Sequence, residues 1–254
     1  MRAALLLMVG LLSGCAVYGP PSGRAPEEEP RDAWARVLLQ RVDPQGRVDF
    51  AGLARDRADL DRTVAWIYAV SPDNRPDLFP TPQHVLAYHL NAYNALAMYA
   101  VLESGIPETN AGFGKVRFFF LRRVEVGGRR LNLRAYENEV IRPLGDPRVH
   151  FALNCMSVGC PRLPREPFRA ETLDAQLERA AREFFAEERN ARVDVASRKV
   201  YLSEILDFFP EDFLAVAPSL ILFANRYRQS PLPEGYTLDF TPYDWAINRQ
   251  PRAP

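Results

Sequence analysis

The clearest pattern of hydrophobic positions is a helical one that begins at Thr81 and ends at Gly105. Thr81 followed by proline is typical of a helix start, and Gly105 suits a left-handed helix end. Apolar residues surround this segment almost completely, which is typical of a buried helix, so we expect it to form the centre of the fold. Its polar residues are then expected to be partly buried and to need hydrogen-bond partners, namely His84, Tyr88, His89, Asn91 and Asn94.

Helical spacing of apolar residues recurs before and after this segment. Asp32, Asn132 and Thr172 stand where side-chain N-caps are expected. The spacing predicts further helices over residues 32–42, 53–70, 133–142, 172–190 and 218–228.

Alternating apolar and polar residues predict two β-hairpins. Residues 116–133 alternate on both sides of Gly127-Gly128, which is typical of a two-residue turn, and residues 193–202 predict the second hairpin. Residues 148–153 predict a buried strand, and we expect an irregular chain after residue 228. The predicted fold class is α+β: a single helix-rich domain with a central long helix and two β-hairpins forming a small, mostly antiparallel sheet.

The N-terminus has the pattern of a secretory signal. Arg2 precedes an apolar run over residues 3–12, which is shorter than the ~18 residues that a membrane-spanning helix needs. Leu-Ser-Gly-Cys at residues 12–15 resembles the bacterial lipobox, in which the cysteine is acylated and becomes the new N-terminus. We therefore expect residues 1–14 to be a lipoprotein signal peptide and Cys15 to be the lipidation site. The alternative is an ordinary signal followed by a chance cysteine.

The membrane is the partner that this anchor predicts, because two or three lipid chains hold a protein stably. Ala16 stands where an aspartate would indicate inner-membrane retention, so the resemblance points to the outer membrane, with the protein facing the periplasm. Residues 15–30 hold the lipidated cysteine and a flexible tether rich in proline, glycine and glutamate. Residues 31–254 are expected to form one globular domain.

Composition argues against a disordered chain and against a nucleic-acid-binding protein. With 47% hydrophobic and 25% charged residues, the chain has globular proportions. Its 32 basic and 32 acidic residues cancel, so no overall field would attract nucleic acid, and we expect no nucleic-acid partner.

Two cysteines, Cys155 and Cys160, fall within the predicted domain. An even number of cysteines in an exported domain favours a disulfide, which here would close a short local loop. The alternative is that Cys155 is a nucleophile with His150 as its base and Asn154 or Glu137 orienting the ring. Residues five apart lie on opposite faces of a strand, so this second hypothesis requires a turn near Asn154.

Other polar residues have both a structural and a functional interpretation. Asn91 and Asn94 are substrate-binding candidates, although residues at this helical spacing more often hold neighbouring backbone. Arg142 is a candidate cationic clamp or an ordinary helix-end charge. His84 and His89 remain alternative bases for Cys155, because distance along the sequence does not determine distance in the fold.

Metal and cofactor chemistry have little support. His150, Cys155 and Cys160 are soft ligands, but a structural zinc site needs four. The sequence contains no glycine-rich phosphate loop and no serine-hydrolase elbow. We therefore expect no metal and no cofactor.

Six short segments carry a family resemblance. They are residues 46–50, 91–94, 136–142, 146–155, 160–161 and 243–248. In this order they resemble the family catalogued as domain of unknown function 547, and the segment from His150 to Pro161 is the most specific. The resemblance implies a bacterial envelope protein with an α+β domain and no established activity. Asn138 stands where the family commonly has a histidine, so no role of that histidine carries over.

Residues and resemblance together predict a cell-envelope lipoprotein. One hypothesis is a Cys/His thiol-dependent hydrolase or acyl transferase that acts on peptide or cell-wall peptide. The alternative is a non-catalytic binding or scaffolding module with a local disulfide between Cys155 and Cys160.

Overall fold

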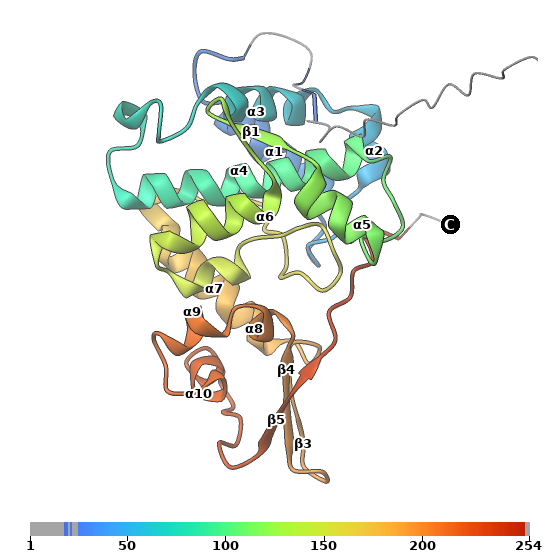
Figure 1. Ribbon diagram of the computed structural model, residues 1–254, viewed down its shortest axis with the longest axis vertical. Helices are drawn as coiled ribbons and strands as arrows, with labels where there is room; N and C mark the ends of the chain where they lie inside the picture. Colours follow the sequence, from blue (N-terminus) through green and yellow to red (C-terminus); the bar gives the residue numbers. More distant parts are fainter. Residues whose placement is uncertain (1–17, 20, 22–24, 252–254) are drawn as a thin grey trace, which may run out of the picture.

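The computed structural model describes residues 18–19, 21 and 25–251 (Figure 1). The expected signal peptide, Cys15 and much of the expected tether lie outside the described residues. Within the described part of the chain, no helix has both the length and the apolar character to cross a membrane.

Helix α4 (Pro82–Glu103) forms the centre of the fold, as predicted. The Thr81 side chain accepts a hydrogen bond from the His84 N–H, and Gly105 has a φ of 77° in the left-handed region that ends the helix. The buried polar residues find partners. Tyr88 donates to the Val70 carbonyl, and His89 Nδ1 lies 2.8 Å from the hydroxyl of Tyr136.

Within the described residues, three α-helices precede α4, and α3 packs against it. They are α1 (Arg31–Arg41), α2 (Phe50–Arg55) and α3 (Ala58–Ala69), followed by the 3₁₀ turn η1 (Pro76–Leu78). The predicted helix over residues 53–70 is two helices, because Asp49 caps a separate one by accepting a hydrogen bond from Gly52 N–H. The predicted N-cap Asp32 lies instead in the first turn of α1, after Pro30.

The first hairpin is shorter than predicted. Strands β1 (Val124–Val126) and β2 (Arg129–Leu131) are antiparallel, and both turn glycines have positive φ, as a primed turn requires. Residues 116–121 were expected to be strand, but they belong to helix α5 (Phe113–Val116) and the π-helical segment η2 (Arg117–Leu121). The uninterrupted apolar run at residues 118–121 has no two-residue alternation to favour a strand.

The following segment supplies Arg134, Glu137, Arg142 and His150 to the site. Asn132 caps α6 (Leu133–Ala135), as predicted, and the helical chain continues through η3 (Tyr136–Ile141) and η4 (Arg142–Leu144). The predicted strand over residues 148–153 is wrong, because this segment contains the 3₁₀ helix η5 (Pro147–Phe151). Asp146 caps η5, and Pro147 suits a helix start but cannot donate to a strand ladder.

The C-terminal half joins helices to a three-stranded sheet. Its helical elements are η6 (Ala170–Thr172), α7 (Leu173–Ala186), α8 (Ile205–Phe208), α9 (Pro210–Leu214) and α10 (Leu220–Asn225). Strands β3 (Ala191–Asp194) and β4 (Lys199–Ser203) form the predicted second hairpin. Strand β5 (Thr237–Thr241), which was not predicted, pairs parallel with β4.

The α+β prediction is confirmed: the fold is helix-rich, and its two small sheets are mostly antiparallel. The two hairpins lie in separate sheets rather than in one.

The buried residues form two hydrophobic clusters that meet at the loop after η5. Val149, Ala152 and Cys155 belong to the cluster around α4, whereas Phe151 belongs to the cluster around α7 and α10. After β5, the chain returns toward α5 (Figure 1) and runs along residues 156–159. The loop after η5 therefore packs against the cluster around α4 and is hydrogen-bonded to the C-terminal segment.

Candidate functional site

The loop from Asn154 to Cys160 brings the two cysteines together. Asn154 Oδ1 accepts a hydrogen bond from Met156 N–H at 2.7 Å, and its Nδ2 donates to the Pro161 carbonyl at 2.8 Å. Met156 has a φ of 66°, a conformation that a residue with a side chain rarely adopts. The turn that the cysteine hypothesis requires near Asn154 is therefore present, and Asn154 holds it closed.

The C-terminal segment covers this loop. Val158 N–H donates to the Ala246 carbonyl and Gly159 N–H to the Asp244 carbonyl, both at 2.8 Å. A Cβ atom at Gly159 would lie 2.9 Å from the Tyr243 ring, so only glycine allows this close approach without displacement. The pairing places the Tyr243 hydroxyl beside the two sulfurs.

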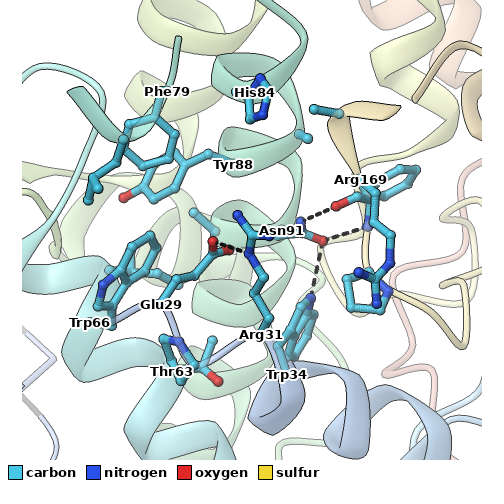
Figure 2. A pocket seen from close by; sticks show the side chains of 18 of the residues that line it. Glu29, Arg31, Trp34, Thr63, Trp66, Phe79, His84, Tyr88, Asn91 and Arg169 are labelled. Atoms are coloured by element: carbon cyan, nitrogen blue, oxygen red, sulfur yellow. Dashed lines mark hydrogen bonds and ion pairs between the residues drawn. The ribbon is translucent and has the colours of Figure 1, made fainter. Parts of the chain in front are cut away.

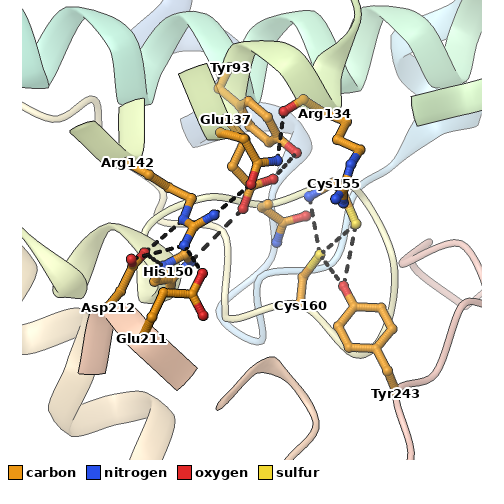
Figure 3. A network of polar contacts seen from close by, with 12 residues as sticks. Tyr93, Arg134, Glu137, Arg142, His150, Cys155, Cys160, Glu211, Asp212 and Tyr243 are labelled. Atoms are coloured by element: carbon orange, nitrogen blue, oxygen red, sulfur yellow. Dashed lines mark hydrogen bonds and ion pairs between the residues drawn. The ribbon is translucent and has the colours of Figure 1, made fainter. Parts of the chain in front are cut away.

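The two cysteines are free thiols and both are buried. Their Sγ atoms lie 3.2 Å apart, and the Cys155 N–H donates to Cys160 Sγ at 3.1 Å. The Tyr243 hydroxyl lies 3.3 Å from Cys155 Sγ and 2.9 Å from Cys160 Sγ (Figure 3). Ser157 Oγ is a further polar atom, 3.5 Å from Cys155 Sγ.

These contacts shift the pKa values of the two thiols in opposite directions. The hydrogen bond from Cys160 lowers the pKa of Cys155 to about 6, against the opposing effect of burial, and Ser157 and Tyr243 add to the lowering. Burial raises the pKa of Cys160 well above its ordinary value, and the neighbouring Cys155 raises it further. The lowered pKa of Cys155 favours its thiolate, which is the nucleophilic form of a thiol.

His150 lies with carboxylates rather than with a sulfur. Its Nε2 is 2.7 Å from Asp212 Oδ2, and its Nδ1 is 3.9 Å from Glu137 Oε1. Its ring stacks on Phe209 with the centroids 4.3 Å apart. Among the described hydrogen bonds, Cys155 Sγ has Cys160, Ser157 and Tyr243 as partners and not His150.

Glu137 is the group on which both His150 and Cys155 act electrostatically. Burial raises its pKa, a charged His150 lowers it, and the Cys155 thiolate raises it again. The Tyr93 hydroxyl donates to Glu137 Oε2 at 3.2 Å. The net effect is a raised pKa, because burial outweighs the lowering by His150, Tyr93 and Arg142.

Asp212 and Arg142 complete the network around His150. Arg142 Nε donates to Asp212 Oδ2 at 2.7 Å, and its guanidinium also pairs with Glu211. Burial opposes the ionisation of Asp212, but the hydrogen bonds from His150 and Arg142 outweigh it and hold its pKa well below the usual range. Arg142 is thus engaged in positioning Asp212.

These groups surround a pocket of about 230 Å³. Polar residues on its wall are Glu137, Asn138, His150, Cys155 and Cys160, together with the cations Lys115 and Arg134. The remaining wall is largely aromatic, from Tyr93, Phe119, Phe120, Phe208, Phe209, Tyr243 and Trp245. Considering only the residues that the structure describes, no group of three or more His, Cys, Asp or Glu side chains is arranged to hold a metal ion.

The predicted substrate-binding residues on α4 hold backbone instead of lining this pocket. Asn94 Nδ2 donates to the Ala152 carbonyl and its Oδ1 accepts from Asn154 N–H. Asn91 bonds both the N–H and the carbonyl of Phe168. His84 and Asn91 line a different pocket (Figure 2), and His89 is paired with Tyr136.

Sequence reasoning did not single out Asp212, Tyr243, Lys115 or Arg134 as site residues. Tyr243 falls in the last of the six segments that carry the family resemblance, which was a usable signal. Asp212 follows His150 by 62 residues and lies in a short helix with no distinctive motif, so nothing in the sequence connects the two.

Comparison with known proteins supports a relationship but supplies no activity. Residues 79–185 match the family described as "Protein of unknown function, DUF547", and the matched range includes Glu137, His150 and both cysteines. No curated protein matches the chain. No solved structure matches it either.

Proposed function

We propose that the protein is a cell-envelope lipoprotein whose pocket performs thiol-dependent hydrolysis or acyl transfer on a peptide or cell-wall peptide. The observation that carries this proposal is the Cys155 sulfur on the wall of a pocket, where its contacts with Cys160, Ser157 and Tyr243 lower its pKa and so favour the nucleophilic thiolate. The same pocket contains Glu137, whose pKa is raised by burial, so that it can serve as a proton donor closer to neutral pH than an ordinary carboxyl.

The envelope location rests on the N-terminal sequence. The charged residue, the apolar run and Cys15 occur in the order of a lipoprotein signal. Lipidation of Cys15 would keep the domain close to the outer membrane. Peptides and cell-wall peptides are present there, and their amide groups are the proposed substrates. Replacing Cys15 with serine should move the protein from the detergent fraction to the soluble periplasmic fraction.

The proposed reaction assigns a role to each group. The Cys155 thiolate attacks the carbonyl carbon of an amide, so that a C–S bond forms and the C–N bond breaks. The leaving amine takes the proton of Glu137. Water or an acceptor amine then attacks the thioester, its proton returns to Glu137, and the C–S bond breaks to restore the thiolate. His150 lies beside Glu137 and is held there by Asp212, while Asn154 positions the nucleophile's loop.

A second candidate function has its own observation. The two sulfurs lie 3.2 Å apart and need little movement to form a bond, which an oxidising compartment would favour. The protein would then be a binding or scaffolding module whose disulfide braces the loop. This candidate requires no reactive thiol.

Thiol chemistry separates the two candidates. Protein isolated from the periplasm without reductant is assayed for free thiols, and alkylation by iodoacetamide is followed by mass spectrometry between pH 5 and pH 9. The enzyme hypothesis expects two free thiols and alkylation of Cys155 with a midpoint near its pKa of about 6. Cys155→Ser should abolish both this reaction and hydrolysis of peptide or activated-ester substrates. A native protein with no free thiol supports the scaffold, and two unreactive thiols would falsify the enzyme.

A further inference from the structure

The pocket beside Cys155 carries two cations that form no ion pair with any described carboxylate. Lys115 Nζ lies 4.1 Å from the ring centre of Trp245 and 5.5 Å from that of Phe208. The Arg134 guanidinium carbon lies 5.3 Å from the ring centre of Phe120. Arg142, another cation near the site, is instead engaged by two carboxylates.

The aromatic rings around these cations form a continuous apolar wall. Tyr243 and Trp245 have ring centroids 4.4 Å apart, and Phe208 stacks on Trp245 at 6.3 Å. Phe119 contacts Trp245 edge to face at 5.9 Å. Such a wall suits a bulky apolar side chain, and cation–π contacts keep the two cations at the surface of the rings.

The acidic groups of the pocket do not neutralise the cations. Glu137 Oε2 accepts a hydrogen bond from the Tyr93 hydroxyl, and among the described ion pairs Glu137 has His150 as its partner rather than Lys115 or Arg134. Lys115 is half-buried beside aromatic rings, so it interacts with an added carboxylate more strongly than a cation in open water does, whereas Arg134 is exposed and can reach an incoming carboxylate from solvent. A guanidinium offers paired donors that match both carboxylate oxygens, and an ammonium adds a point charge.

We propose that Lys115 and Arg134 bind a free carboxylate of the substrate while the aromatic wall takes a neighbouring apolar side chain. This inference rests on the proposed thiol chemistry and specifies its substrate class: a peptide with a carboxylate adjacent to a bulky apolar residue. Lys115 and Arg134 are then the specificity-determining residues, and Cys155 reacts with the carbonyl group that they bring into the pocket.

Binding tests the inference separately from the reaction. The probes are N-acetyl-phenylalanyl-alanine as the free acid and as its carboxamide, titrated by calorimetry into the full-length Cys155→Ser protein. We expect the acid to bind about tenfold more tightly than the amide, and Lys115→Met or Arg134→Met to remove most of this difference without weakening the amide. Lys199→Met is the matched control, because Lys199 pairs with Asp239 outside the pocket. Equal affinity for acid and amide overturns the inference.

A second readout uses the thiol itself. Iodoacetate and iodoacetamide both alkylate a thiolate with loss of iodide, but only iodoacetate carries a carboxylate. We expect the iodoacetate-to-iodoacetamide rate ratio at Cys155, relative to that of free cysteine, to be raised in the wild type and to fall several-fold in Lys115→Met and Arg134→Met. If Cys155 is inert to both reagents while the acid still binds selectively, the proposed reaction fails and the carboxylate site stands. If Cys155 reacts but shows no preference, the carboxylate site fails alone.

Discussion

The Tyr243 hydroxyl contacts the sulfur atoms of both Cys155 and Cys160. The Tyr243 side chain is held there by the pairing of residues 244–246 with the cysteine loop, and burial raises its pKa well above the ordinary value. It therefore stays protonated and has one hydrogen to donate. That hydrogen stabilises whichever sulfur is charged, which is Cys155 at neutral pH.

Removing this hydroxyl should raise the pKa of Cys155. In Tyr243→Phe the thiolate loses a donor, and because a hydrogen bond to a charged group contributes about 1.5 kcal/mol or more, the midpoint of iodoacetamide alkylation should move up by about one pH unit. Tyr201→Phe, at a tyrosine in β4 outside the pocket, should leave the midpoint unchanged. An unaltered midpoint in Tyr243→Phe would show that the hydroxyl does not stabilise the thiolate.

Cys160 should have a larger effect, because its hydrogen bond is the main cause of the low pKa of Cys155. Cys160→Ala removes the donor, so the alkylation midpoint of Cys155 should rise from about 6 toward the ordinary value for a thiol. Cys160→Ser keeps a donor at the same place and should preserve much of the lowering. Neither variant can form the local disulfide, so a difference between them measures the hydrogen bond alone. Identical midpoints would contradict this assignment.

At the scale of the elements, local chemistry decides which predictions succeed. Helix α4 was predictable because Thr81 and Gly105 mark its ends, and the first hairpin because two glycines supply the positive φ values of its turn. Strand β5 was not predictable, because it pairs in parallel with β4, and that pairing depends on contacts some 40 residues away.

In the candidate site, too, local contacts were predictable from the sequence and long-range contacts were not. The closeness of Cys155 and Cys160 follows from a short loop with a turn near Asn154, so the sequence was enough to predict it. The partners of His150 were not predictable, because Asp212 approaches from another hydrophobic cluster. A residue type and its spacing indicate a group that can react, but the tertiary fold decides which neighbour it meets.

The first hairpin offers a matched test of its turn. Gly127 has a φ of 57°, and a Cβ atom there would collide with the Ser71 side chain, whereas Gly128 has a φ of 82° and open space around it. Gly128→Ala should lower the free energy of unfolding by about 1–2 kcal/mol through backbone strain. Gly127→Ala should cost more, because the collision adds to the same strain. Urea unfolding measures both, and equal losses would show that Ser71 moves aside freely.

At the scale of the whole molecule, the site joins the two hydrophobic clusters. Phe151 packs on Phe184, Phe185 and Phe213 in one cluster, while the adjacent Ala152 lies in the other. The ion pair between Arg142 and Asp212 also connects these two parts of the fold, because Arg142 follows η3 and Asp212 lies in α9. The residues that position the reactive groups therefore also help to hold the two hydrophobic clusters together.

This double role gives the molecule an acid-sensitive contact. The pKa of Asp212 is depressed in the folded protein by His150 and Arg142, in spite of burial. A depressed carboxyl pKa contributes stability at any pH above the ordinary value of about 3.9, and this contribution is lost as the pH falls through the folded pKa. Asp212→Asn should therefore lower the free energy of unfolding at pH 7.

The difference between wild type and Asp212→Asn should shrink as the pH falls below about 4, because the Asp212 carboxyl of the unfolded wild-type chain then takes up a proton, while the folded protein loses this charge only at the lower, depressed pKa. Urea unfolding at pH 7, 5 and 3 measures this difference directly. Asp239→Asn is the matched control, since its ion pair with Lys199 is more exposed and should contribute at most about 1 kcal/mol. A deficit in Asp212→Asn that stays constant down to pH 3 would mean that the carboxylate charge does not hold α9 against His150 and Arg142.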